Sequence, residues 1–173
     1  MTRSQHLRRV AILCCHCLRN LAFYKAGWHN GKIKLKSQFW LNVNGNFLDI
    51  AVLEWCKLFA DPRGKHFWRK AISDVATFQK GLFTELGCTE TEYEDYVKQV
   101  RGYRDKFVAH LDSEEIMQIP FLQSAVNSTE YLYDYLLEKE ETNGCFADAQ
   151  KGGFKFYEKF FAEGTAVYEK NRA

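Results

Sequence analysis

Apolar residues recur every three or four positions through most of this chain, and that spacing limits its fold more than any other feature of the sequence. The two prolines, Pro62 and Pro120, border such stretches and do not interrupt them. At 173 residues the chain has the size of one domain with its own core, so we predict a single all-α domain. The stretches expected to be helical are residues 4–26, 46–60, 66–86, 89–111 and 120–139.

Breaks in the helical pattern divide the domain into three parts. Two Asn-Gly pairs predict a loop over residues 27–45, and a short helix near residues 37–41 is the alternative. Thr89 and Glu92 have the spacing of a capping box, which predicts a helix start. An acidic linker at residues 138–144 leads to a last segment that becomes helical after a Gly-Gly pair. The expected parts are a basic N-terminal helix and loop (residues 1–45), a bundle core (46–140) and a C-terminal helix (145–173).

Cations and carboxylates are distributed unevenly along the chain. The net charge is only +2, yet the first carboxylate is Asp49, so residues 1–48 carry basic charge alone. A basic half can bind a polyanion such as RNA, because phosphate contacts dominate non-specific affinity. A solvated basic helix without a ligand is the alternative. The eight cations are Arg3, Arg8, Arg9, Arg19, Lys25, Lys32, Lys34 and Lys36.

Four adjacent residues, Cys14-Cys15-His16-Cys17, have side chains that can bind a metal. On one helix they point around the whole cylinder and cannot all reach one tetrahedral zinc ion. Cys14 and Cys17 could bind zinc only with a third cysteine from elsewhere, so buried cysteines that pack as small apolar residues are the favoured interpretation. The sequence also lacks carboxylate–histidine clusters, glycine-rich phosphate loops and dinucleotide motifs. We therefore expect neither a metal nor a cofactor.

A short apolar run at residues 10–15 follows Arg8 and Arg9. His16 and Arg19 interrupt the run and no small-residue cleavage site follows, so we do not predict a secretory signal. No run reaches the ~18 apolar residues that a membrane-spanning helix needs. These observations predict a cytoplasmic protein with reduced thiols and no membrane partner.

Residues 103–112, Tyr-Arg-Asp-Lys-Phe-Val-Ala-His-Leu-Asp, place charges and a histidine where the apolar stripe of a helix should continue. Arg104 falls on the buried stripe. Glu54 lies inside an apolar helix and needs a cation, for which Lys57 is one candidate and Arg104 the favoured one. Near the end of the helix, the helix dipole favours the protonated form of His110, which suits acid–base chemistry.

This string resembles the signature of the HEPN superfamily, in particular of its branch related to abortive-infection proteins. In that signature an arginine is followed by a polar residue and a histidine closes the motif. Asp105 and His110 match these two positions. The order of helices over residues 46–138 is similar as well. The resemblance implies an up-and-down bundle of four to six helices, dimerised so that two motifs face one cleft.

For catalytic members of the family, the resemblance implies metal-independent cleavage of RNA by attack of the ribose 2′-hydroxyl. His110 would then be the general acid and base. Arg104 would stabilise the phosphate charge of the transition state, and Asp105 would orient one of these two residues or a bound nucleotide. Lys106 and Tyr103 are the expected substrate-binding residues.

The expected partners follow from the same resemblance. They are RNA and a second copy of the chain, which would supply the second histidine. A toxin or phage-defence role would add an antitoxin protein. The alternative is a bundle that binds nucleotides or a partner protein without catalysis. Arg9 and His16 repeat a similar arginine–histidine spacing in the first helix, so spacing alone does not choose between these functions.

Overall fold

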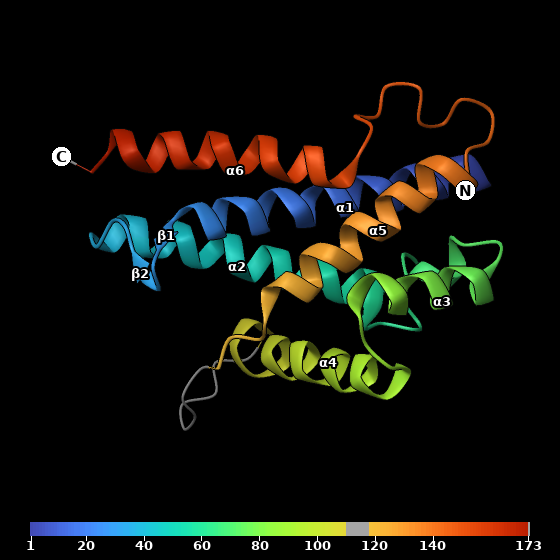
Figure 1. The fold of residues 1–173 in the computed structure, drawn as a ribbon, viewed down its shortest axis with the longest axis horizontal. Helices are drawn as coiled ribbons and strands as arrows, with labels where there is room; N and C mark the ends of the chain where they lie inside the picture. Colours follow the sequence, from blue (N-terminus) through green and yellow to red (C-terminus); the bar gives the residue numbers. More distant parts are fainter. Residues whose placement is uncertain (110–117, 173) are drawn as a thin grey trace.

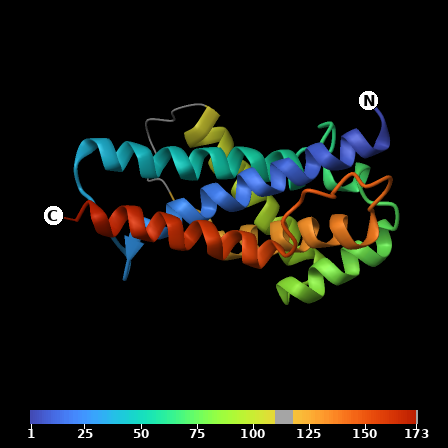
Figure 2. The same ribbon diagram turned by 90° about the horizontal axis from the view of Figure 1, so that it is seen from above.

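The central helix of the fold is α1 (Arg3–Ala26), which packs against α2, α5 and α6. The computed structural model describes residues 1–109 and 118–172, and within them it confirms the predicted all-α helical bundle. No helix in this part of the chain is long and apolar enough to cross a bilayer. Figure 1 and Figure 2 both show α1, α2 and α6 side by side along the long axis of the molecule. The other elements are β1 (Trp28–His29), β2 (Lys32–Ile33), α2 (Gln38–Phe59), η1 (Trp68–Lys70), α3 (Val75–Leu86), α4 (Glu90–Tyr103), η2 (Arg104–Ala109), α5 (Leu122–Lys139) and α6 (Gly153–Lys170).

The start and the buried stripe of α1 follow from its sequence. The Thr2 hydroxyl accepts a hydrogen bond from the Gln5 N–H at 3.2 Å, and the Gln5 side chain accepts one from the Thr2 N–H at 3.0 Å. This capping box provides hydrogen-bond acceptors for two backbone N–H groups that have no partner within the helix. Cys14 and Cys17 lie on the buried stripe with 0% exposure, so they pack as small apolar residues. Burial raises the pKa of the Cys17 thiol to about 12.

α2 begins at Gln38, well before the predicted start of the helix at residue 46. The Asn44 amide explains the difference, because it donates to the Tyr24 carbonyl at 3.0 Å and to the Tyr168 hydroxyl at 3.1 Å. Its oxygen accepts from the Trp28 indole at 2.9 Å. A buried asparagine whose amide has these partners no longer forms hydrogen bonds with nearby backbone groups. The residues that were expected to form a turn at Asn44 are therefore helical. Within residues 27–45 the prediction of a loop is correct only before Gln38, where β1 and β2 form a hairpin.

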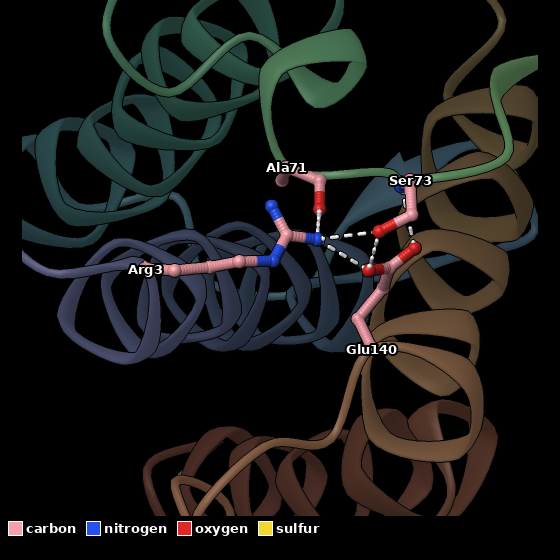
Figure 3. Close-up of polar contacts among 4 residues, drawn as sticks. All are labelled: Arg3, Ala71, Ser73 and Glu140. Atoms are coloured by element: carbon pink, nitrogen blue, oxygen red, sulfur yellow. Dashed lines mark hydrogen bonds and ion pairs between the residues drawn. The ribbon is translucent and has the colours of Figure 1, made fainter.

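The single helix predicted for residues 66–86 is wrong. Only a 3₁₀ turn, η1, and the later helix α3 form in that stretch. Figure 3 shows why: Arg3 donates to the Ala71 carbonyl at 3.0 Å, and the Glu140 carboxylate accepts from both the N–H and the hydroxyl of Ser73, each at 2.7 Å. These tertiary bonds take backbone groups that a continuous helix would use. Asp74 then caps α3 by accepting from the Thr77 N–H at 3.0 Å.

The later helices agree better with the sequence. Thr89 and Glu92 form the predicted capping box at the start of α4. α5 ends at Lys139 as expected, and α6 begins at Gly153, the second residue of the Gly-Gly pair. In Figure 1, α4 lies on the side of α2 that faces away from α6. The C-terminal end of α4, which carries the motif, is thus on an outer layer that rests on α2.

Candidate nucleic-acid interface

The motif lies where α4 changes its winding. Up to Tyr103 the helix is α, and Arg104–Ala109 form a π-helix, η2. π-Helical turns are rare and occur frequently at functional sites. His110, the predicted acid and base, lies outside the described residues.

Arg104 and Asp105 contact one another directly. Nε and Nη2 of Arg104 donate to Oδ1 of Asp105 at 2.8 and 2.6 Å. Arg101, one helical turn earlier, places its Nε 3.8 Å from Oδ2 of the same carboxylate. The Arg104 side chain is 22% exposed and that of Asp105 is 49% exposed, so the pair lies at the surface with the arginine partly covered.

The favoured pairing of Arg104 with Glu54 does not form. Glu54 accepts instead from Lys57 on its own helix, with Nζ 3.2 Å from each carboxylate oxygen. The physical reason is proximity along the chain, since both Glu54 and Arg104 find an opposite charge within three residues. The structure therefore places Glu54 outside the motif, in a local ion pair of α2.

Cys56 of α2 is the buried neighbour of Arg104. Its thiol is 1% exposed, and burial raises its pKa to about 11, although the charge of Arg104 acts in the opposite direction. For Arg104, burial opposes the charge, but the hydrogen bond with Asp105 and further carboxylates outweigh it and raise the guanidinium pKa. Arg104 is therefore a permanent cation held between a buried thiol and a carboxylate.

A groove of about 750 Å³ runs along the other side of the same helix end. Tyr103 and Lys106, the two residues expected to bind substrate, are among the residues that line it, and Phe121, which also lines it, is 72% exposed. Arg104 and Asp105 are not among the described residues that line this groove. The structure therefore brings Tyr103 and Lys106 together in the groove and places Arg104 and Asp105 on a neighbouring face.

Sequence reasoning missed the charge density of this helix end. Lys98 and Arg101 precede the motif, so residues 96–109 contain four cations and one carboxylate, Asp105. Counting charges in a short window along the sequence would have found this cluster. The basic surface was instead predicted for residues 1–48, because they hold eight cations and no acid.

Four of the eight cations in the basic N-terminal half have a partner among the described residues. Three of its cations pair with carboxylates of the C-terminal part, and the Arg19 guanidinium lies 4.8 Å from the centre of the Phe160 ring. A charge that already has a partner binds phosphate less readily, so this half offers a weaker footprint for a polyanion than its composition predicts. The three pairs are Arg3–Glu140 (2.5 Å), Arg8–Asp148 (2.6 Å) and Lys34–Glu169 (3.1 Å).

The part of the chain that the structure describes contains no group of three or more histidine, cysteine, aspartate or glutamate side chains that could hold a metal. Cys14 and Cys17 are free thiols in the core. Comparisons of the chain with protein-family profiles, with curated proteins and with solved structures give no match.

Proposed function

We propose that the chain binds single-stranded RNA at the C-terminal end of α4 and cleaves it without a metal ion. The observation that carries the proposal is the groove beside the motif, which is lined by Lys106, by the exposed ring of Phe121 and by Lys98, whose ammonium also holds Asp95 at 2.9 Å. Cations that follow a phosphate backbone, together with aromatic rings on which bases stack, are the usual elements of single-strand binding.

The proposed chemistry assigns one role to each motif residue. His110 removes the proton of the 2′-hydroxyl, or donates one to the leaving 5′-oxygen. Before the strand binds, Asp105 orients the guanidinium of Arg104. Arg104 then exchanges this carboxylate for a phosphate, whose oxygens accept from the same two nitrogens, while Lys106 and Tyr103 hold the strand in the groove. A homodimer would bring together two copies of His110, one for each proton transfer.

Cleavage of a labelled single-stranded RNA in the presence of EDTA tests the proposal. His110→Ala and Arg104→Ala should each slow cleavage by about 10²-fold or more, as expected for loss of an acid–base group or of phosphate stabilisation. Arg9→Ala and His16→Ala are matched controls, because they repeat the arginine–histidine spacing on α1. The proposal fails if His110→Ala cleaves as fast as the parent, or if the parent cleaves no RNA when the enzyme is in excess.

The second candidate is a bundle that binds RNA or a nucleotide without catalysis, and the Arg104–Asp105 pair favours it. A guanidinium already bound to a carboxylate is a poor catalytic cation unless the substrate displaces that carboxylate. Fluorescence anisotropy with uncleavable RNA separates the two functions. With either function, Arg101→Gln should weaken RNA binding. The plot of log affinity against log salt concentration should also become less steep, by about 0.7 in slope. Arg8→Gln, whose charge is paired with Asp148, should change neither.

A toxin or phage-defence role, with an antitoxin protein as a partner, belongs to the catalytic candidate alone. Induced expression of the parent chain and of His110→Ala in a bacterial host would test it. Growth arrest with the parent and normal growth with the variant would support the role. Equal growth of the two strains at equal protein levels would count against it.

A further inference from the structure

A second pocket adjoins the groove beside the motif, and we call it the hairpin pocket. The end of α1, the turn between β1 and β2, the start of α5 and one residue of α6 line it. Its volume is about 470 Å³, within the range of about 300–1,000 Å³ that is usual for ligand sites. Ile119, Pro120 and Phe121 line both the hairpin pocket and the groove, so this segment is a wall that the two share. A strand that leaves the groove across this wall enters the hairpin pocket.

The shared wall has a fixed backbone and an exposed ring. The Tyr96 hydroxyl of α4 donates a hydrogen bond to the Phe121 carbonyl at 2.9 Å, which ties the wall to α4. The Phe121 ring itself projects into solvent. A single exposed apolar side chain needs no explanation, but this ring borders two pockets of one surface. It can therefore stack with a base where the strand crosses from the groove to the hairpin pocket.

The hairpin pocket has an aromatic wall of its own. Trp28 lines the pocket and is partly exposed, and the Tyr24 ring packs against it with 5.8 Å between the ring centres. The Trp28 indole N–H donates to the buried Asn44 side chain at 2.9 Å, and the Asn44 amide donates to the Tyr24 carbonyl at 3.0 Å. These bonds hold the Trp28 ring in one orientation without a ligand. A base that stacks on it therefore loses little affinity to the ordering of the site.

The charge at the hairpin pocket favours a phosphate. Lys25 is the one charged side chain among the described residues that line it, so no carboxylate there opposes an anion. Lys25 is exposed, and in residues 1–109 and 118–172 it makes no ion pair. The side-chain amides of Asn30 and Gln123 also line the pocket, and an amide can donate to and accept from the edge of a base.

We infer that the hairpin pocket holds one unpaired nucleotide of the RNA that occupies the groove, with its base stacked on Trp28 and its phosphate beside Lys25. The inference rests on the proposed binding of single-stranded RNA. It extends the binding site from the end of α4 across Phe121 to the end of α1. It also gives a role in binding to Lys25, a cation of the basic N-terminal half.

Fluorescence anisotropy with an uncleavable single-stranded RNA of about ten nucleotides tests this inference. Lys25→Gln should weaken binding about four-fold at about 0.15 M salt, and the plot of log affinity against log salt concentration should become less steep by about 0.7 in slope. Trp28→Ala should weaken binding about five-fold or more, because base stacking is lost. Arg9→Gln is the control, since it removes another exposed cation of α1, about 24 Å nearer the start of the helix, and it should bind like the parent.

Crosslinking of the parent keeps the test valid if Trp28→Ala folds differently. The same RNA with 4-thiouridine at every position should crosslink to residues 24–28 as well as to the groove, and an excess of unlabelled RNA should suppress both products. The inference is overturned if only the groove crosslinks, or if Lys25→Gln binds like Arg9→Gln. RNA binding at the groove would still be supported if Lys106→Gln weakened it. If the parent binds no RNA, the inference and the proposed function both fail.

Discussion

The Arg104 guanidinium holds the carboxylate of its sequence neighbour Asp105 through two nitrogens, with Nε 2.8 Å and Nη2 2.6 Å from Oδ1. A phosphate that is to contact Arg104 must compete with this carboxylate. At the proposed site, Asp105 would therefore lower the affinity for RNA, and its contact with Arg104 fixes the direction of the guanidinium.

Replacing Asp105 by asparagine should separate binding from cleavage. Asp105→Asn frees the guanidinium, so we expect RNA binding to become about three-fold to ten-fold tighter and cleavage to become slower. Asp148→Asn is the control, because it removes a carboxylate that is bound to Arg8 at 2.6 Å, away from the groove. Anisotropy and cleavage assays measure the two effects. Equal changes in both variants would show that only the net charge matters.

The Glu140 carboxylate should contribute more to stability than any exposed ion pair. It is 6% exposed and accepts from Ser73 and Arg3, as Figure 3 shows. Glu140→Ala leaves these donors without a partner, so we expect a loss of about 2–3 kcal/mol in the free energy of unfolding. Asp148→Asn, in the exposed pair with Arg8, should cost clearly less, because solvent screens that pair. Urea unfolding measures the loss of stability in both variants, provided that the m-value does not change. Similar losses would contradict the prediction that the buried carboxylate contributes more.

Glu130 should make the stability depend on pH. Burial, with the charge of Asp134 next, raises the pKa of its carboxyl from 4.5 to about 7, and its Oε1 has no partner among the described residues. Between these two pKa values the folded chain retains a proton that the unfolded chain has lost. Stability from this group is therefore present below the lower pKa and is lost as the pH rises through about 7.

Glu130→Gln should flatten that dependence. We expect the variant to be about 1–2 kcal/mol more stable than the parent at pH 8, a figure reduced because the carboxyl is only partly buried. The two should be nearly equal in stability at pH 4. Glu163→Gln, on the exposed face of α6, is the control and should keep the slope of the parent. Urea unfolding at several pH values gives the result, and an unchanged slope in Glu130→Gln would exclude this carboxyl as the cause.

Replacing two helical glycines by alanine, one at a time, should change the stability of the fold in opposite directions. A Cβ at Gly164 would lie 2.9 Å from both Ala26 and Phe23, because α6 approaches α1 closely there. Gly164→Ala should therefore cost about 1–3 kcal/mol by overpacking. Gly45 in α2 has no atom within 4 Å of the added Cβ, so Gly45→Ala should gain about 0.5–1 kcal/mol from helix propensity. Thermal unfolding of both variants checks the signs, and a stable Gly164→Ala would mean that α6 can shift.

The candidate site shows how far a motif can be interpreted without the fold. The string around Arg104 lies at a helix end where Tyr103 and Lys106 line a groove. The partner of Arg104 and the π-helical turn were not predictable from apolar spacing. Both depend on how the end of α4 rests on α2, where Cys56 is the buried neighbour.

Local sequence was sufficient to predict the helical class and most helix starts, because apolar spacing and capping act within one or two turns. The capping box at Thr89 is an example. Contacts between distant segments required the folded chain. Asn44 becomes helical because it bonds to Tyr24 and to Tyr168, which lies 124 positions away. The helix predicted for residues 66–86 breaks because Glu140, 67 positions from Ser73, takes its N–H. A buried hydrogen bond outweighs a local propensity of less than about 1 kcal/mol, and no local pattern indicates where such a partner will lie.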